Sequence, residues 1–331
     1  MVLTATAPLR ASLSTNKSGS DRLYLISGSA HTTLAQDIAN YLGTSLIPII
    51  SKRFADGEIY VQIQESIRGG DVYLIQPTSY PVNDCLMELM IMIDACRRAS
   101  ARQITAVIPY SGYTRADRKV SGRESITAKL VANLITTAGA DRVLAMDLHS
   151  AQVQGFFDIP LDHIYSTPVL LNYLQSKQLR DVVVVSPDIG GVGRARAFAK
   201  KFNDAPLAIV DKRRTAHNCA KVMNVIGDVK GKTAILVDDM IDTAGTITEA
   251  AKILRQEGAR QVFACATHAV FSPPAIERLS SGCLEEVIVT NTIPIPEDKR
   301  FPQLTVVSVA NFFGEAILRL HQESSISTMF I

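Results

Sequence analysis

Two adjacent aspartates, Asp238 and Asp239, directly follow the short apolar run at 234–237. Neighbouring carboxylates repel each other, so a purely structural role for this pair is difficult to find. A buried run of this length is typical of a strand in an open α/β sheet, and such sheets bind ligands at the carboxyl ends of their strands. At that place the two carboxylates can accept hydrogen bonds from a pair of ligand hydroxyl groups.

The segment after the pair has the composition of an anion site. Its residues are mostly small or carry a hydroxyl group, and they lead into a predicted helix: Asp242, Thr243, Ala244, Gly245 and Thr246. Small residues let backbone N–H groups turn towards a ligand, and a helix N-terminus adds partial positive charge. Thr246 with Glu249 predicts a capping box. Together the pair and the segment predict a site for a ribose phosphate. A plain capped turn is the structural alternative, and no Walker sequence follows.

The elements that must position this site repeat along the chain as an apolar run, a loop and a helix. Further runs that predict strands lie at 23–28, 46–54, 72–76, 104–110, 141–150, 182–188 and 207–214. Helices are expected at about 31–42, 83–98, 126–137 and 192–202, with Gly43 and Gly139 ending the first and third. Short buried strands that alternate with helices predict an α/β fold with a mainly parallel sheet flanked by helices.

Two sequence matches indicate a tandem duplication. Ser51-Lys52-Arg53 and Asp211-Lys212-Arg213 are 160 residues apart, and 100–108 resembles 258–266 at an offset of 158. We therefore expect one domain at 21–165 and a second at 166–331. Residues 1–20, rich in Ser, Thr and Ala, are expected to be a disordered tail, with a transit peptide as the lesser alternative.

The duplication makes the differences between the two halves informative. VDDMIDTAGT at 237–246 stands where the first half has IQPTSYPVND at 75–84. The scaffold needs a packed strand in both copies, but it needs the aspartates in neither. The acidic segment therefore indicates a function that belongs to the second copy.

Composition narrows the function classes. The net charge of +2 provides no global basic field for nucleic acid, and charges such as Asp94 interrupt the apolar stretches, so no membrane span is expected. The five cysteines form no Cys-x-x-Cys pair, which fits thiols in a reducing compartment and favours a cytoplasmic location. The six histidines form no His-x-x-x-His ligand pair.

Several segments carry a resemblance to a known family. They are KRFADGEIYVQIQESIRG, NDCLMELMIMIDACRRASARQITAVIPY, MDLHSAQVQGFFDIP, VSPDIGGVGRARAFAK, DKRRTAHN, VDDMIDTAGT and VTNTIP. In this order they resemble the class I ribose-phosphate diphosphokinases, the PRPP synthetases, over nearly all of the chain after about residue 21. The resemblance implies two tandem domains of the type I phosphoribosyltransferase fold, with ATP on the N-terminal side and ribose 5-phosphate on the C-terminal side.

The implied reaction transfers a diphosphoryl group from Mg²⁺-ATP to ribose 5-phosphate, as in nucleotide and histidine biosynthesis. The anomeric hydroxyl attacks the β-phosphorus, and the products are AMP and 5-phosphoribosyl 1-diphosphate. Such a step depends on positioning and on cationic stabilisation more than on covalent help from the protein.

The resemblance also implies roles for individual residues. Lys212 and Arg214 match the catalytic residues, and His149 and Asp188 match residues at the magnesium–ATP site. The expected ATP-binding residues are Asp56, Gly57, Glu58, Arg115, Ala116 and His149. The expected ribose 5-phosphate residues are Arg214, Asp238, Asp239, Asp242, Thr243, Ala244, Gly245 and Thr246.

Each role has a simpler alternative. Lys212 can belong to a solvated basic run, and His149 can be a structural histidine. Asp188 can cap the following glycine turn, and Asp56 with Gly57 and Glu58 can form a polar turn. The basic loop at 110–125, which in the family closes over ATP, departs from the family pattern at three positions. Ala116 replaces a usual Gln, Ser125 a usual Pro and Ser111 a usual aromatic residue.

The family further implies a homohexamer in which Asp56, Gly57 and Glu58 serve an adjacent subunit. Arg68 and the C-terminal SSISTMFI resemble its regulatory region, so phosphate and ADP are expected effectors. Two rival functions remain at this point. One is a phosphoribosyltransferase that consumes the product, which needs only one such domain and a base-recognising hood. The other is a non-catalytic regulatory homologue, against which the joint presence of Lys212, Arg214, His149 and Asp188 argues.

Overall fold

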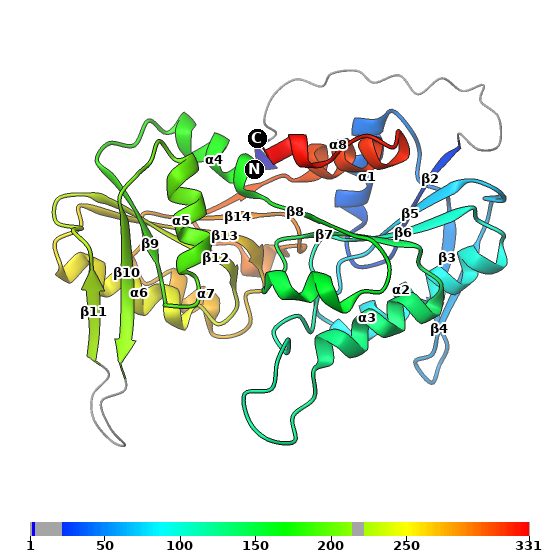
Figure 1. The fold of residues 1–331 in the computed structure, drawn as a ribbon, viewed down its shortest axis with the longest axis horizontal. Coiled ribbons are helices and arrows are strands. Elements are labelled where there is room, and N and C mark those ends of the chain that lie inside the picture. The colour runs from blue at the N-terminus through cyan, green and yellow to red at the C-terminus, as the bar shows by residue number, and fades with distance from the viewer. Residues whose placement is uncertain (1, 4–21, 214–221, 331) are drawn as a thin grey trace. The chain divides into compact units, whose positions relative to one another are not determined.

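The computed structural model describes residues 2–3, 22–213 and 222–330. These residues form two compact units (Figure 1). The N-terminal unit comprises residues 22–165, 292–294 and 309–330, and the C-terminal unit comprises residues 2–3, 166–213, 222–291 and 295–308. Each unit has a mainly parallel sheet flanked by helices, which confirms the predicted fold class.

The N-terminal unit is built on a five-stranded parallel sheet with the order β2-β5-β6-β7-β8. Its strands are β2 (Leu23–Ser27), β5 (Asp71–Ile75), β6 (Gln103–Ile108), β7 (Arg142–Met146) and β8 (Leu161–Ile164). Its helices are α1 (Thr32–Leu42), α2 (Val82–Arg98), α3 (Thr127–Ala138) and α8 (Ala310–His321), with 3₁₀ turns η2 (Ala151–Phe156) and η4 (Ser327–Phe330). A separate antiparallel hairpin joins β3 (Ile49–Arg53) to β4 (Ile59–Ile63).

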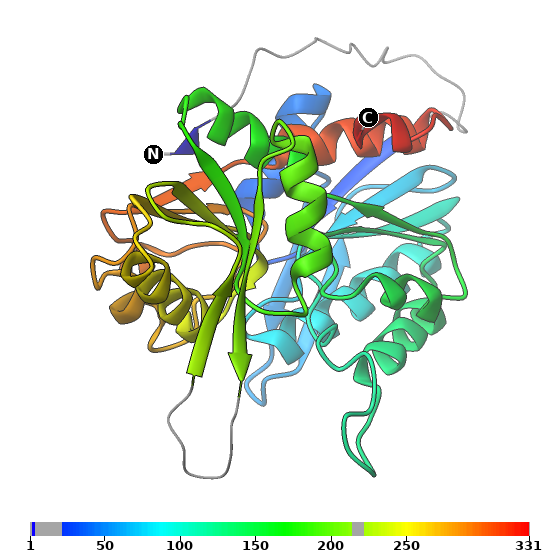
Figure 2. The same ribbon diagram turned by 60° about the vertical axis from the view of Figure 1, so that its left-hand side comes forward.

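The C-terminal unit has an eight-stranded sheet with the order β1-β15-β14-β13-β12-β9-β10-β11, in which only β10 and β11 pair antiparallel. Its strands are β1 (Val2–Leu3), β9 (Val182–Ser186), β10 (Leu207–Arg213), β11 (Val222–Ile226), β12 (Thr233–Ile241), β13 (Gln261–Ala269), β14 (Glu286–Thr290) and β15 (Leu304–Val307). Its helices are α4 (Thr167–Ser176), α5 (Val192–Lys201), α6 (Gly245–Gln256) and α7 (Ala275–Leu279), with the 3₁₀ turn η3 (Glu297–Lys299). Figure 2 shows α5 lying along one face of this sheet, where it contacts β9, β10 and β12.

The two sheets repeat one topology. The order β2-β5-β6-β7-β8 in the first corresponds strand by strand to β9-β12-β13-β14-β15 in the second. The registers agree, because Asp71 pairs with Gln103 in the first sheet and Thr233 pairs with Gln261 in the second. This correspondence supports the duplication and places Gln76 at the position of Asp238.

Local sequence explains the helices that flank the sheets. In α1 the buried Leu34, Ile38 and Leu42 recur at intervals of four residues and form one apolar face. Gly43 then adopts a left-handed conformation with φ of 66° and donates its N–H to the carbonyl of Ala39, which ends the helix. Gly139 ends α3 in the same way with φ of 115°.

The units do not follow a simple division of the chain at residue 165. Although it comes last in sequence, α8 belongs to the N-terminal unit, where it packs on α1. A Cβ atom on Gly314 would lie 2.3 Å from the Tyr41 ring, and Tyr41 donates a hydrogen bond to Glu315 at 3.1 Å. The close approach of these two helices therefore places the C-terminal segment with the first copy instead of the second.

The expected tail at 1–20 also differs in its first residues. Val2 and Leu3 form β1, which pairs parallel with Val306 and Val307 of β15, because the open edge of that sheet can accept a further strand. The rest of the predicted tail lies outside the described residues. In the described part of the chain, no helix has the length and apolar character required to cross a membrane.

Candidate functional site

The two aspartates lie within β12 and not after it. β12 pairs with β9 only as far as Leu236, but it continues beside β13 to Ile241. Pairing with one neighbour therefore keeps Asp238 and Asp239 extended, while the end of β9 leaves their other side open to the segment that follows that strand. The prediction that the pair lies near the carboxyl ends of the strands is confirmed, but β12 extends to Ile241 and does not end at residue 237 as predicted.

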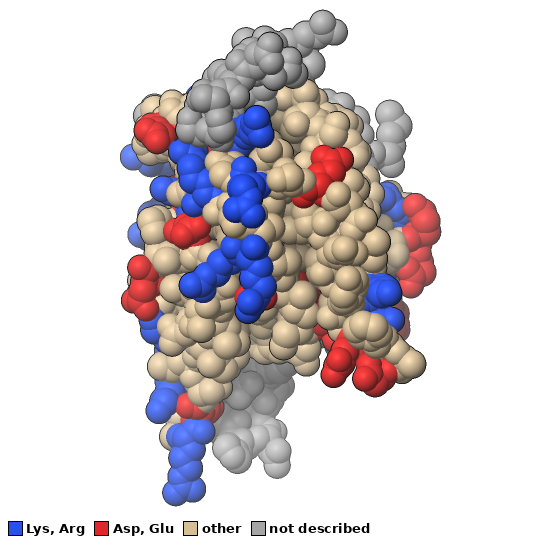
Figure 3. All heavy atoms as spheres, turned by 90° about the vertical axis from the view of Figure 1, so that its right-hand side faces the viewer, with Lys and Arg blue, Asp and Glu red and all other residues tan. Residues whose placement is uncertain are grey.

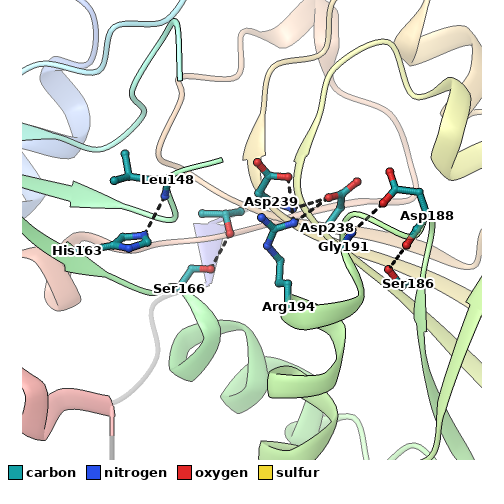
Figure 4. A network of polar contacts seen from close by, with 10 residues as sticks. Leu148, His163, Ser166, Ser186, Asp188, Gly191, Arg194, Asp238 and Asp239 are labelled. Carbon is teal, nitrogen blue, oxygen red and sulfur yellow. Dashed lines mark hydrogen bonds and ion pairs between the residues drawn. The ribbon is translucent and has the colours of Figure 1, made fainter. Parts of the chain in front are cut away.

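An arginine bridges the acidic pair (Figure 4). Nη1 of Arg194 lies 3.1 Å from Oδ1 of Asp238 and 3.1 Å from Oδ1 of Asp239. Oδ1 of Asp238 also accepts a hydrogen bond from the backbone N–H of Asp239 at 2.9 Å. The side chain of Asp239 is only 3% exposed, whereas that of Asp238 is 20% exposed. Asp238 is thus the more accessible member of the pair.

The surroundings of Asp238 favour the neutral form of its carboxyl group. Burial, followed by the neighbouring Asp239 carboxylate, raises the pKa of Asp238 well above its ordinary value, while Arg194 acts in the opposite direction. Burial and the neighbouring carboxylate together therefore outweigh Arg194 in their effect on the pKa of Asp238. A ligand that donates hydrogen bonds from hydroxyl groups would stabilise the charged form of the pair.

Sequence reasoning missed Arg194, which lies in the first turn of α5. A cation at this place is opposed by the helix dipole, so an arginine there is an unusual feature that needs an acidic partner. The sequence alone does not identify Asp238 and Asp239 as this partner, because residue 194 precedes them by more than forty positions. Only the neighbouring places of β9 and β12 in the sheet bring them together.

The segment between β12 and α6 turns through Ala244. Ala244 adopts a left-handed conformation with φ of 59° and is the N-cap residue of α6, which begins at Gly245. No side chain in the described ranges caps this helix N-terminus. Its first N–H groups have no partner within the helix, so the turn has the donors of an anion site.

The predicted capping box is wrong. Thr246 lies inside α6, and the helix has no side-chain cap. Thr248 instead donates its hydroxyl back to the carbonyl of Ala244 at 2.8 Å. Arg278, a second residue that the sequence did not reveal, donates to the carbonyl of Thr243 at 2.9 Å and thereby holds the turn from α7.

Asp188 lies at the end of the neighbouring strand β9. Its Oδ1 accepts a hydrogen bond from the N–H of Gly191 at 2.8 Å, and its carbonyl accepts one from Ser186 Oγ at 2.6 Å (Figure 4). The simpler reading of Asp188 as the cap of a glycine turn is therefore confirmed. The side chain is nevertheless exposed, so it lies at the same open edge as Asp238.

Two further candidates follow adjacent strands of the N-terminal unit. Arg115 is exposed in the loop after β6, and His149 is exposed after β7. The loop is organised by Glu124, which accepts hydrogen bonds from the N–H groups of Val120 and Ser121 at 2.7 and 3.0 Å. Gln152 of η2 donates to Asp117 at 2.6 Å, so the loop that carries Arg115 and the segment that carries His149 are joined.

Ala116 is anchored through its backbone. Its N–H donates to the carbonyl of Tyr113 at 3.1 Å, and its carbonyl accepts from the N–H of Ala128 at 3.2 Å. The alanine therefore keeps a fixed backbone position at the base of the loop without adding a polar side chain.

Asp56, Gly57 and Glu58 form the exposed turn of the β3–β4 hairpin. Asp56 Oδ1 accepts from the N–H of Glu58 at 3.1 Å, and Gly57 has φ of 97°, a conformation that favours glycine. These three residues lie on a two-stranded sheet of their own and so are not joined by strand pairing to the strands that carry Arg115 and His149.

The basic segment is described only in part. The backbone of Lys212 belongs to β10, where it pairs with Met223 of β11. Arg214 lies outside the described residues. This antiparallel pair corresponds to the β3–β4 hairpin of the first copy, where Lys52 pairs with Tyr60.

Comparison with known proteins agrees with this architecture. Residues 23–139 match the N-terminal domain of ribose phosphate pyrophosphokinase, and residues 213–331 match the phosphoribosyl synthetase-associated domain. A ribose-phosphate pyrophosphokinase of Nostoc sp. is 76% identical over 309 residues, which cover 93% of this chain and 94% of the relative. The chloroplastic ribose-phosphate pyrophosphokinase 1 of Arabidopsis thaliana is 69% identical over 94% of this chain and 77% of its own length.

A solved structure shows the same fold. The phosphoribosylpyrophosphate synthetase of Mycobacterium smegmatis is 47% identical, with a TM-score of 0.87 over 91% of this chain and 99% of that protein. The resemblance that the motifs predicted is therefore confirmed over both copies. The chain belongs to the ribose-phosphate pyrophosphokinase family of enzymes, the PRPP synthetases.

Proposed function

We propose that the open edge of the C-terminal unit binds ribose 5-phosphate for diphosphoryl transfer from ATP. One arrangement supports this assignment most strongly. Asp238 and Asp239 share Arg194 beside a helix N-terminus that no described side chain caps. The carboxylates accept hydrogen bonds from the 2- and 3-hydroxyl groups of ribose, and the turn from Asp242 to Thr246 binds the 5-phosphate through its backbone N–H groups.

Residues of the N-terminal unit are proposed to bind ATP. Arg115, in the loop joined to the His149 segment, brings positive charge to the polyphosphate, and Ala116 supports that loop through its backbone. Asp56, Gly57 and Glu58 lie on an exposed hairpin turn, which fits a role in binding adenine for an adjacent subunit of a homohexamer.

The metal is proposed to be Mg²⁺, held with ATP by His149 and Asp188. No group of three or more metal-binding side chains occurs in the described ranges. Mg²⁺ does not require one, because it usually keeps several waters and is bound through one or two carboxylates and substrate phosphates. The exposed Asp188 carboxylate fits that manner of binding. When bound, the ion neutralises phosphate charge.

Lys212 and Arg214 are the proposed catalytic residues. The anomeric hydroxyl of ribose 5-phosphate forms a bond to the β-phosphorus of ATP, the bond from that phosphorus to the α-phosphate oxygen breaks, and AMP leaves. The two cations stabilise the negative charge that develops on the transferred group and on the leaving phosphate.

Location and effectors are proposed with the same function. Cys85 and Cys96 are buried free thiols, which fits a reducing cytoplasm. Burial in the protein also raises the pKa of Cys96 to about 12, and the resulting lack of thiolate protects this residue from oxidation. Phosphate and ADP are proposed effectors near Arg68, which donates to Ser100 Oγ at 3.1 Å. On the face drawn in Figure 3, a band of Lys and Arg side chains lies among interspersed Asp and Glu side chains, and such basic groups attract anions.

The test is release of AMP from ATP with and without ribose 5-phosphate, with Mg²⁺ present. AMP that forms only with the sugar phosphate, together with an equal amount of 5-phosphoribosyl 1-diphosphate, supports the proposal. A chain that binds both substrates without forming AMP would be the regulatory homologue, and one that consumes the diphosphate sugar would be a phosphoribosyltransferase. Family membership favours neither alternative.

A further inference from the structure

The backbone that leads to His149 is held by the next strand of the sheet. Asp147 directly follows β7 and has φ of 39°, in the left-handed region that non-glycine residues rarely adopt. Its N–H donates to the carbonyl of Ile164 at 3.0 Å, and the N–H of Leu148 donates to Nε2 of His163 at 2.9 Å (Figure 4). Two hydrogen bonds to β8 therefore hold an unfavourable turn directly before His149.

The second of these bonds depends on a side chain. Leu148 is buried, so its N–H would remain without a partner if the imidazole of His163 were absent or rotated. The ring of His163 is in turn packed against Tyr165, with centroids 4.4 Å apart and planes at 44°. The orientation of the acceptor nitrogen is thus coupled to the position of Tyr165.

Tyr165 is covered from the C-terminal segment. Phe330 contacts it edge to face, with centroids 5.5 Å apart, and Phe330 also packs against Phe312 of α8 at 5.7 Å. Arg319 of α8 holds the intervening residues, because it donates to the carbonyl of Ser325 at 3.1 Å and to Thr328 Oγ1. All these residues belong to the N-terminal unit.

We propose that His163 is a positioning residue for His149, and that Phe330 supports it through Tyr165. The contacts form one continuous series from η4 through two aromatic rings to the amide that precedes the candidate ATP residue. The role of His149 itself rests on the proposed function, whereas the series of contacts does not. A change at the C-terminal segment would therefore alter the use of ATP without any contact to the nucleotide.

The first test compares substitutions of His163 in the full-length protein. His163→Phe keeps an aromatic ring but removes the acceptor, and His163→Gln restores an acceptor oxygen. We expect His163→Phe to raise hydrogen exchange about 10-fold in a peptide that spans residues 145–152, and to lower kcat/KM for ATP by a similar factor. His163→Gln should recover most of both losses, and KM for ribose 5-phosphate should change less than twofold.

His321→Phe is the matched control, because His321 contacts Asp71 in the same unit and not Leu148. It should leave exchange at 145–152 unchanged. Equal loosening by both histidine substitutions, or no change in His163→Phe, overturns the proposal. If His163→Phe does not fold, Phe330→Ala decides the matter. It should raise the same exchange about threefold, and an unchanged value overturns the support from the C-terminal segment.

A third variant separates this proposal from the proposed function. His149→Ala should abolish most activity and leave its neighbours protected by β8. Wild-type activity in His149→Ala would refute the role of His149 in ATP use, while the exchange results would still decide whether His163 and Phe330 hold the turn.

Discussion

The end of β5 and the part of β12 around Asp238 occupy the same place in the two copies, but their side chains are used differently. In the first copy Gln76, fully buried, donates to Glu88 of α2 at 2.7 Å and accepts from the N–H of Ala30 at 3.1 Å. Glu88 also accepts hydrogen bonds from Ser29 Oγ at 2.6 Å and Ser51 Oγ at 2.7 Å. The polar groups of this strand end thus satisfy one another inside the fold.

The matching strand positions of the second copy carry carboxylates. Asp238 stands at the position of Gln76, and the exposed Asp188 stands at that of Ser29. Asp238 and Asp239 share Arg194 of α5, and Asp188 accepts a hydrogen bond from the N–H of Gly191. The comparison teaches that this strand position is a buried member of a structural network in one copy, whereas in the other it carries a carboxylate that is 20% exposed, near the exposed Asp188.

The largest expected effect is on turnover, and it should distinguish Lys212 of β10 from Lys52 of β3. In its proposed role Lys212 stabilises negative charge in the transition state, so Lys212→Ala should lower turnover by at least roughly 10²–10³-fold. Lys52→Ala, its counterpart in the first copy, removes a cation that lies over the rings of Phe54 and Tyr60 at 5.8 and 5.1 Å. We expect it to alter turnover far less. Steady-state AMP formation measures both, and similar losses would contradict separate roles for the two strands.

The next prediction compares the affinity for ribose 5-phosphate after substitution in 237–246 and in the corresponding segment 75–84. Asp238→Asn should weaken binding of ribose 5-phosphate roughly 10- to 100-fold, since a charge-assisted hydrogen bond is replaced by a neutral one. Asp84→Asn, in the corresponding segment of the first copy, removes only an exposed ion pair with Arg53 and should have no measurable effect. Isothermal titration calorimetry decides between them. Equal losses would show that the two copies are not functionally distinct.

Substitution of one carboxylate should lower the free energy of unfolding in the first copy and raise it in the second, and the change should be larger in the first. Glu88→Ala should reduce the free energy of unfolding by about 2–4 kcal/mol, because Ser29, Ser51 and Gln76 lose a shared buried acceptor. Urea unfolding at neutral pH measures this change. A loss below about 1 kcal/mol would show that the network is not structural.

The smallest expected effect is a gain in the second copy. The pKa of Asp238 is raised in the folded protein, so the wild type loses stability as pH rises from the ordinary carboxyl value of 3.8 towards the raised one. Asp238→Asn should therefore stabilise the unliganded protein by on the order of 1 kcal/mol at about pH 8 and not at about pH 4. Thermal unfolding at both pH values provides the check. A loss of stability at about pH 8 would mean that Arg194 more than compensates for the pair.

Much of this architecture could be predicted from the sequence, because buried strands appear as apolar runs and helices end at glycines such as Gly43 and Gly139. The acidic pair could be placed at a sheet edge for the same reason. Arg194 could not be assigned, since only the neighbouring positions of β9 and β12 bring it to Asp238. The capping box failed because the left-handed turn at Ala244 starts α6 before Thr246, a backbone choice that spacing alone does not reveal.

The packing of α8 on α1 has a consequence for how the chain is made. Tyr41 precedes Gly314 and Glu315 by more than 270 residues, so it leaves the ribosome well before they are added. At about 5–20 residues per second, the face of α1 that α8 will cover waits on the order of tens of seconds for its partner. The first copy is therefore completed only after the second has been made, and a chain cut short before α8 would leave this face of α1 uncovered.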